Sequence, residues 1–208
     1  MASEPSLWLS GQRKILASKS ATRLGLLRAA ALPIEALPAD VDERAIEAAF
    51  FRDGGTAPRL AAILAAEKAL AASRRIPDAL VIGADQTLTL GKTLLHKAAS
   101  RAEAAANLRR LAGRKHRLTS AVAMAQGGEL LHAFEDYADL TMRHLSDSAI
   151  ERTLDIAGEG ALHSVGGYQL EGVGVHLFSR VVGAHATILG LPMMPLLAWL
   201  RDRGIIGP

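Results

Sequence analysis

The chain has 208 residues, of which 50% are hydrophobic and 22% are charged, and its formal net charge is +3. These values are typical of a globular protein that can bury a sizeable core, and the small net charge argues against a nucleic-acid partner. The absence of cysteine excludes disulfides and thiolate chemistry. Since no uncharged apolar run is long enough to cross a bilayer and residues 1–11 lack a signal-peptide pattern, we expect a cytoplasmic protein without a membrane partner.

The first half of the chain alternates short apolar runs with stretches of helical periodicity. We expect a single domain over 1–208, with 1–13 as a loosely ordered N-terminal extension. The elements predicted for this half, in chain order, are a strand at 14–17, a helix running to residue 30, a strand within 31–38, helices at 43–52 and 56–75, and strands at 79–83 and 87–90.

The second half begins with a capping box, Ser100 to Glu103, and contains a hairpin signal at Gly127-Gly128. The predicted elements are a helix at 100–113, strands at 118–125, 130–134 and 138–143, a helix from 146 to about 156, a glycine-rich loop at 158–174, strands at 175–181 and 187–189, and a helix at 192–203. Strands that alternate with helices, together with one hairpin, predict an α/β fold with a mixed central sheet flanked by helices.

Asp85 is the first candidate functional residue, because it follows the predicted strand at 79–83 within two positions. Ligands of open α/β sheets bind outside the carboxyl ends of the strands, so a carboxylate placed there is a candidate metal ligand or general base. The alternative is an ordinary turn former or helix cap. A second segment near the N-terminus, with complementary chemistry, favours the functional interpretation.

That second segment connects the strand at 14–17 to the following helix and contains Ser18, Lys19, Ser20 and Arg23. Unpaired backbone N–H groups and the partial positive charge of a helix N-terminus favour anions. Hydroxyl donors and two cationic side chains add to this, so the loop suits phosphate. The alternative is a serine N-cap with ordinary surface charges.

Eight short strings follow one another along the chain: Leu16-Ala17-Ser18-Lys19-Ser20-Ala21-Thr22-Arg23, Asp42-Glu43, Glu67-Lys68-Ala69, Ile82-Gly83-Ala84-Asp85-Gln86, His96-Lys97, Leu111-Ala112-Gly113, Gly167-Tyr168-Gln169-Leu170-Glu171-Gly172 and Gly190-Leu191-Pro192. Together these strings resemble the Maf family of nucleotide pyrophosphatases, and the resemblance runs from about residue 14 to 203. The resemblance implies a two-lobed, Maf- and ITPase-like α/β fold with a cleft between the lobes, and a possible homodimer. It also implies house-cleaning hydrolysis of nucleoside triphosphates to monophosphate and pyrophosphate with a divalent metal, Mg²⁺ or Mn²⁺.

The resemblance also implies roles for individual residues. Asp85 corresponds to the catalytic proton acceptor of the family, supported by Glu43, Lys97 and Glu171, while Ser18, Ser20 and Arg23 correspond to its phosphate cradle. Lys19, Arg23 and Lys97 would neutralise the negative charge of a triphosphate. Three carboxylates around one site would repel each other without cations, so we expect Glu43, Asp85 and Glu171 to hold the metal. A water deprotonated toward Asp85 would then attack the α-phosphorus. The spacing does not show which of these acids binds the metal and which takes the proton.

Three positions are expected to set base specificity: Thr22, Gln86 and Glu171. Gln86 and Glu171 resemble the residues at these positions in the branch of the family that acts on 7-methyl-GTP. The pyrimidine-directed branch has Thr at position 86 and Gln at position 171. Thr22 stands where the 7-methyl-GTP branch has Trp. The sequence does not name the base.

Two other functions stay open. The string from Asp85 to Thr89 superficially resembles an aspartyl-nucleophile phosphatase motif, although Thr87 replaces its usual second acid. A nucleotide-binding regulator of cell division with a degenerate site is also possible, because Thr22, His96 and Ala98 depart from the family pattern. Monophosphate with pyrophosphate, orthophosphate, or binding without turnover would distinguish the three.

Overall fold

The computed structural model describes residues 6–207, which divide into two compact units. Unit 1 comprises residues 6–86, 120–136 and 189–207 of the described chain, and unit 2 comprises 87–119 and 137–188. The strands are β1 (Lys14–Ala17), β2 (Glu35–Ala36), β3 (Leu80–Leu90), β4 (Thr93–Leu95), β5 (Lys115–Gln126), β6 (Glu129–Met142) and β7 (Phe178–Val182). Strands β3, β5 and β6 therefore contribute residues to both units.

The helices are α1 (Ala21–Ala29), α2 (Glu43–Arg52), α3 (Ala57–Arg75), α4 (Arg101–Leu111), α5 (Asp147–Ala157), α6 (Gly160–His163), α7 (His185–Ile188) and α8 (Met193–Asp202), with a 3₁₀ turn, η1, at Val173–Leu177. The strands of the described chain form a seven-stranded sheet in the order β2-β1-β3-β5-β6-β7, and β4 pairs with β3. Parallel β1–β2 and β1–β3 pairs and antiparallel β3–β4 and β6–β7 pairs make the sheet mixed. The predicted α/β class is confirmed.

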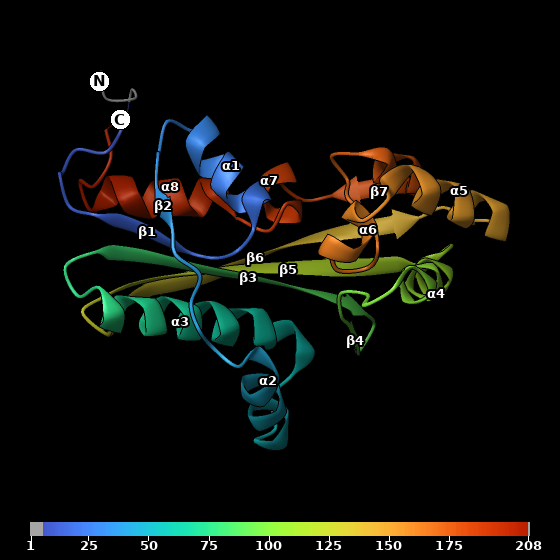
Figure 1. Cartoon of the computed structure of the whole chain (residues 1–208), viewed down its shortest axis with the longest axis horizontal. Helices are drawn as coiled ribbons and strands as arrows, with labels where there is room; N and C mark the ends of the chain where they lie inside the picture. The colour runs from blue at the N-terminus through green and yellow to red at the C-terminus, as the bar shows by residue number, and fades with distance from the viewer. Residues whose placement is uncertain (1–5, 208) are drawn as a thin grey trace. The chain divides into compact units, whose positions relative to one another are not determined.

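In unit 1, α3 lies on one face of the strands, and α1 and α8 lie on the other (Figure 1). The contact with α3 is made by small side chains, including Ala61, Ala65 and Ala69, all of which are fully buried. Gly83 on β3 allows the close approach, because a Cβ added there would lie 2.3 Å from the Ala65 carbonyl oxygen. The small residues at this part of α3 therefore allow the helix to lie close to β3.

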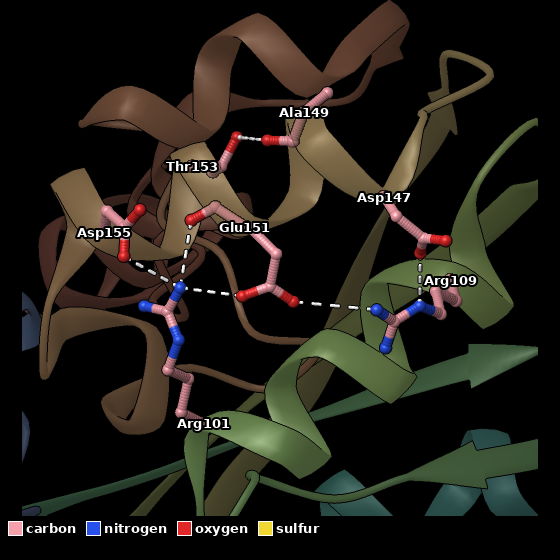
Figure 2. Close-up of polar contacts among 7 residues, drawn as sticks. All are labelled: Arg101, Arg109, Asp147, Ala149, Glu151, Thr153 and Asp155. Carbon is pink, nitrogen blue, oxygen red and sulfur yellow. Dashed lines mark hydrogen bonds and ion pairs between the residues drawn. The ribbon is translucent and has the colours of Figure 1, made fainter.

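In unit 2, one apolar cluster includes residues of α4, α5 and the strands β3 to β6. At its outer side, α4 and α5 are joined by ion pairs, which Figure 2 shows. Arg101 contacts Glu151 and Asp155 at 2.8 Å each, and Arg109 contacts Asp147 at 2.6 Å. Because these side chains are exposed and water screens them, the apolar cluster contributes most to the packing of the two helices.

A buried polar pair lies inside unit 2. His116 Nε2 and the hydroxyl oxygen of Tyr168 are 2.7 Å apart, and both residues are almost fully buried. Burial disfavours the imidazolium and lowers the pKa of His116 to about 4. His116 is therefore neutral in the folded protein at neutral pH.

Two pairs of predicted strands are each continuous in the structure. The predicted strands at 79–83 and 87–90 are one strand, β3 (Leu80–Leu90), and those at 130–134 and 138–143 are one strand, β6 (Glu129–Met142). The strand β3 continues through Ala84, Asp85 and Gln86, and Gln86 Nε2 donates a hydrogen bond to Ser120 Oγ on the neighbouring strand β5. The prediction that Asp85 lies beyond its own strand is therefore wrong.

The predicted strand at 187–189 is also wrong. Residues 185–188 form the helical turn α7, in which the Ile188 N–H donates to the Ala184 carbonyl. A run as short as Thr187-Ile188-Leu189 has too few positions for its periodicity to distinguish strand from helix. The strand expected within 31–38 is reduced to two residues, Glu35–Ala36.

The N-terminal segment differs from expectation as well. Leu9 N donates to Ile205 O at 3.0 Å and Gly207 N donates to Leu7 O at 2.9 Å, so residues 7–9 pair with the C-terminal segment. The expected loose extension does not hold for these residues, and residues 1–5 lie outside the described part of the chain. Among residues 6–207, no helix has the length and apolar character needed to span a membrane.

Candidate active site

The loop between β1 and α1 is held by its two serines. Ser20 is the N-cap of α1, and its side chain accepts a hydrogen bond from the Arg23 N–H at 3.2 Å. Ser18 is buried, and its Oγ accepts from the Ser20 N–H at 3.2 Å. The capping interpretation is thus correct for Ser20. Lys19 is exposed and Thr22 is partly buried on the first turn of α1.

Arg23 is fixed by acceptors from three segments of unit 1. Its Nε donates to the Gly190 carbonyl at 2.8 Å, and its Nη1 donates to Ser18 Oγ at 3.1 Å and to the Ala84 carbonyl at 2.9 Å. Burial lowers the pKa of Arg23, whereas the charges of Asp85 and Glu43 raise it. A guanidinium stays protonated at neutral pH, so a fixed positive charge lies beside β3.

Asp85 lies within β3, next to the end of its neighbour β1. The last residue of β1, Ala17, pairs with Gly83, so Asp85 is two residues past the final β1–β3 pair. The carboxylate is thereby placed beside the Ser18–Arg23 loop, and the carbonyl of the preceding residue, Ala84, accepts a hydrogen bond from Arg23. The structure brings together the two segments that the sequence analysis singled out, although Asp85 does not end its own strand.

Lys68 on α3 connects Asp85 to a second carboxylate. Its Nζ lies 2.5 Å from Asp85 Oδ1 and 2.8 Å from Glu43 Oε1 at the start of α2. The Lys68 and Asp85 side chains are only 11% and 10% exposed, whereas Glu43 is 55% exposed. An ammonium shared by two carboxylates allows the acids to lie close together.

The sequence analysis includes Lys68 in one of the family strings but assigns it no role in the site, although a signal for such a role was present. Along α3 the buried positions include Ala61, Leu64, Ala65, Ala69 and Ala72, and Lys68 lies on the same helical stripe. A lysine on an otherwise apolar stripe requires a buried anion. The sequence does not show which residue is that anion, and the structure shows that it is Asp85 on β3.

The pKa of Asp85 reflects opposing effects. Burial raises it most strongly, Lys68 and Arg23 lower it, and the negative charge of Glu43 raises it, with a net upward shift from the ordinary value. A carboxylate with a raised pKa is a better proton acceptor than a free one. This arrangement suits general-base chemistry.

The remaining predicted site residues divide between the units. Gln86 follows Asp85 in β3 and is partly buried in unit 1. Lys97 and Glu171 belong to unit 2 and are both exposed. Lys97 forms an isolated bridge with Val165, and Glu171 precedes η1 in the glycine-rich loop. Their participation in one site with Asp85 stays a prediction.

The carboxylates that could hold the predicted metal are Glu43 and Asp85 in unit 1. No group of three or more His, Cys, Asp or Glu side chains placed to hold an ion occurs among residues 6–207. Glu43 and Asp85 do lie together around Lys68. Because Mg²⁺ is commonly held by one or two carboxylates plus substrate phosphates, this pair fits a metal that arrives with a nucleotide.

Comparison with known proteins gives consistent matches. The family model described as "Maf-like protein" matches residues 13–203. A "Nucleoside triphosphate pyrophosphatase" of Rhodopseudomonas palustris (strain BisB18) is 50% identical over 202 residues, which cover 97% of this chain and 98% of that protein. One from Nitrobacter winogradskyi is 49% identical, with the same coverage. A "7-methyl-GTP pyrophosphatase" of Rhizobium etli is 48% identical over 92% of this chain and 96% of that protein.

Proposed function

Because this chain belongs to the Maf family, we propose that it hydrolyses nucleoside triphosphates to nucleoside monophosphate and pyrophosphate. Several relatives that match nearly its whole length bear the name of that activity. The enzyme would be a hydrolase acting on acid anhydrides in nucleotide metabolism.

The observation that carries this proposal is the arrangement in unit 1. A buried carboxylate, Asp85, contacts Lys68 at 2.5 Å and lies next to Ala84, whose carbonyl accepts a hydrogen bond from Arg23. Arg23 and the start of α1 offer positive potential for phosphate oxygens. Phosphoryl transfer depends on such positioning and charge stabilisation more than on covalent chemistry by the protein.

In the proposed mechanism, Arg23 and the loop at Ser18 and Ser20 bind the phosphate chain. Asp85 accepts a proton from the attacking water, which its raised pKa favours. Lys68 holds Asp85 in place and compensates its charge and that of Glu43. Lys19 and Lys97 would neutralise further charge of the leaving pyrophosphate.

A divalent cation, Mg²⁺ or Mn²⁺, would be held by Asp85 and Glu43, with Glu171 as a further proposed ligand. When bound, such a cation stabilises the negative charge that develops on phosphate oxygens. The protein groups would orient the nucleotide around it.

The base remains to be assigned, and we propose that Thr22, Gln86 and Glu171 set it. The 7-methyl-GTP pyrophosphatase of Rhizobium etli is a relative at 48% identity, so modified purine nucleotides belong among the substrates tested. A cleft between the lobes, a homodimer, a cytoplasmic location and the absence of a nucleic-acid partner stay predictions.

Product analysis tests the proposal. We expect a panel of canonical nucleoside triphosphates and 7-methyl-GTP, incubated with Mg²⁺ or Mn²⁺, to yield monophosphate and pyrophosphate. In ¹⁸O-labelled water the label should enter the monophosphate, since attack is at the α-phosphorus. Orthophosphate release would support the aspartyl-phosphatase function instead, and tight binding without turnover would support a nucleotide-binding regulator.

A further inference from the structure

Gly190 lies against the guanidinium of Arg23, far from it in sequence. The Gly190 carbonyl accepts a hydrogen bond from Arg23 Nε at 2.8 Å, in the short connection between α7 and α8. The two remaining acceptors of Arg23, Ser18 Oγ and the Ala84 carbonyl, take both hydrogens of Nη1. The Nη2 group has no hydrogen-bond partner within the part of the chain that the structure describes.

A side chain at position 190 would disturb this arrangement in two ways. A Cβ would lie 3.1 Å from Arg23 Nε and 3.2 Å from Nη2, closer than ordinary van der Waals contact. Gly190 also has a φ of +93°, which residues with a Cβ rarely adopt. The position therefore combines a backbone acceptor for Arg23 with the space that the guanidinium needs.

We propose that Gly190 is a positioning residue for phosphate binding, acting through Arg23. Its carbonyl holds the Nε edge of the guanidinium, and its lack of a side chain keeps the Nη2 edge in place for a phosphate oxygen. Because a guanidinium recognises phosphate through a fixed planar set of donors, a small rotation weakens the contact. This inference rests on the proposed function, in which Arg23 binds the phosphate chain.

The test compares Gly190→Ala with Gly204→Ala. Gly204 also has a positive φ, of +62°, but a Cβ there would meet nothing within 4 Å, so Gly204→Ala adds a side chain at a positive φ without a contact to Arg23. We expect Gly190→Ala to raise the KM for the nucleotide about ten- to a hundredfold, as the loss of one charge-assisted hydrogen bond predicts. Gly204→Ala should leave KM unchanged.

A double-mutant cycle with Arg23→Gln separates positioning from general damage. If Gly190 acts through Arg23, Gly190→Ala adds little to the KM of Arg23→Gln. An equal KM increase in both backgrounds would overturn the proposal. If Gly190→Ala alone does not fold, the change is made in the Arg23→Ala variant, and the resulting fall in melting temperature is compared with the fall that Gly204→Ala causes in the same variant. We expect the two falls to be equal. A larger fall with Gly190→Ala would also overturn the proposal.

Calorimetric binding of inorganic tripolyphosphate keeps this inference separable from the proposed function. Weaker binding by Gly190→Ala, but not by Gly204→Ala, supports the positioning role even if the wild-type protein releases no pyrophosphate. Equal tripolyphosphate binding by both variants and the wild type counts against it even if the hydrolysis is confirmed.

Discussion

Lys68 is the residue whose contacts most directly influence the protonation of the candidate site. It lies between Asp85 and Glu43 and is almost fully buried. Its positive charge opposes the upward shift that burial gives the pKa of Asp85. The three side chains therefore form one electrostatic unit, in which a change at Lys68 must appear at Asp85.

Replacing Lys68 by Met, which has a similar shape and no charge, tests this coupling. The pKa of Asp85 should rise further, so a smaller fraction is ionised at each pH, and the acidic limb of the kcat/KM profile should move to higher pH. We expect kcat/KM at pH 7 to fall about ten- to a hundredfold. Lys92→Met, at an exposed lysine between β3 and β4, is the control. An unchanged acidic limb in Lys68→Met would show that the two groups are not coupled.

We propose that base preference also depends on individual residues, among them Gln86 and Glu171. Gln86 donates from Nε2 to Ser120 Oγ at 2.9 Å, which fixes the orientation of its amide. Thr cannot reproduce this reach, so Gln86→Thr combined with Glu171→Gln should alter the ratio of kcat/KM values between purine and pyrimidine nucleotides. The full nucleotide panel measures this ratio, and an identical base profile would remove these positions from specificity.

At the scale of elements, the contact between α3 and β3 positions Lys68 over Asp85. Gly83 is the point of closest approach, since a Cβ there would meet the backbone of Ala65 and Ala69. Such overpacking against backbone atoms forces the helix to shift. The geometry of the site therefore depends on the absence of a side chain at Gly83.

Gly83→Ala should destabilise the protein by about 1–3 kcal/mol and lower kcat by displacing Lys68. Gly25→Ala in α1 is the matched change, because nothing lies within 4 Å of the added Cβ. It should stabilise the protein by about 0.5–1 kcal/mol through its higher helix propensity. Urea unfolding measures both, and a Gly83→Ala variant as stable as wild type would contradict the proposed contact.

The elements also show where prediction from sequence succeeded. Helix caps depend on a few neighbouring residues, and Ser100 and Ser146 cap their helices as predicted. Ser20 also caps its helix, which was the alternative to the phosphate-binding interpretation. The continuity of β3 through Ala84–Gln86 was missed, because it depends on the neighbouring β5 and not on local sequence. The link from Lys68 to Asp85 was missed for the same reason, since it required the packing of α3 on β3 to be known.

At the scale of the whole molecule, the strands β3, β5 and β6 each supply residues to both units. Unfolding either unit would remove part of all three strands. We therefore expect one cooperative transition. The aromatic residues allow this to be measured, because Trp8 and Trp199 belong to unit 1, whereas Tyr137 and Tyr168 belong to unit 2.

The protonation of the buried His116 destabilises unit 2 and therefore tests whether the two units unfold together. Its pKa falls from 6.5 to about 4 on folding, so the unfolded chain binds more protons between these values, and stability is lost as pH falls through this window. The loss amounts to about 2 kcal/mol between pH 7 and pH 5. Urea unfolding followed by tryptophan fluorescence should show this loss, although both tryptophans are in unit 1.

His116→Gln should reduce the pH dependence of the tryptophan transition, because Gln does not titrate. If the tryptophan midpoint has the same pH dependence in this variant and in the wild type, while the tyrosine signal differs, the two units unfold independently.

The most direct test of the account is pyrophosphate release by Asp85→Asn. This change removes the proton acceptor and keeps the size of the side chain, so we predict a loss of turnover by at least about 10³-fold with cooperative unfolding retained. Asp78→Asn, at an exposed aspartate before β3, should release pyrophosphate at the wild-type rate. Normal pyrophosphate release by folded Asp85→Asn would contradict the central claim.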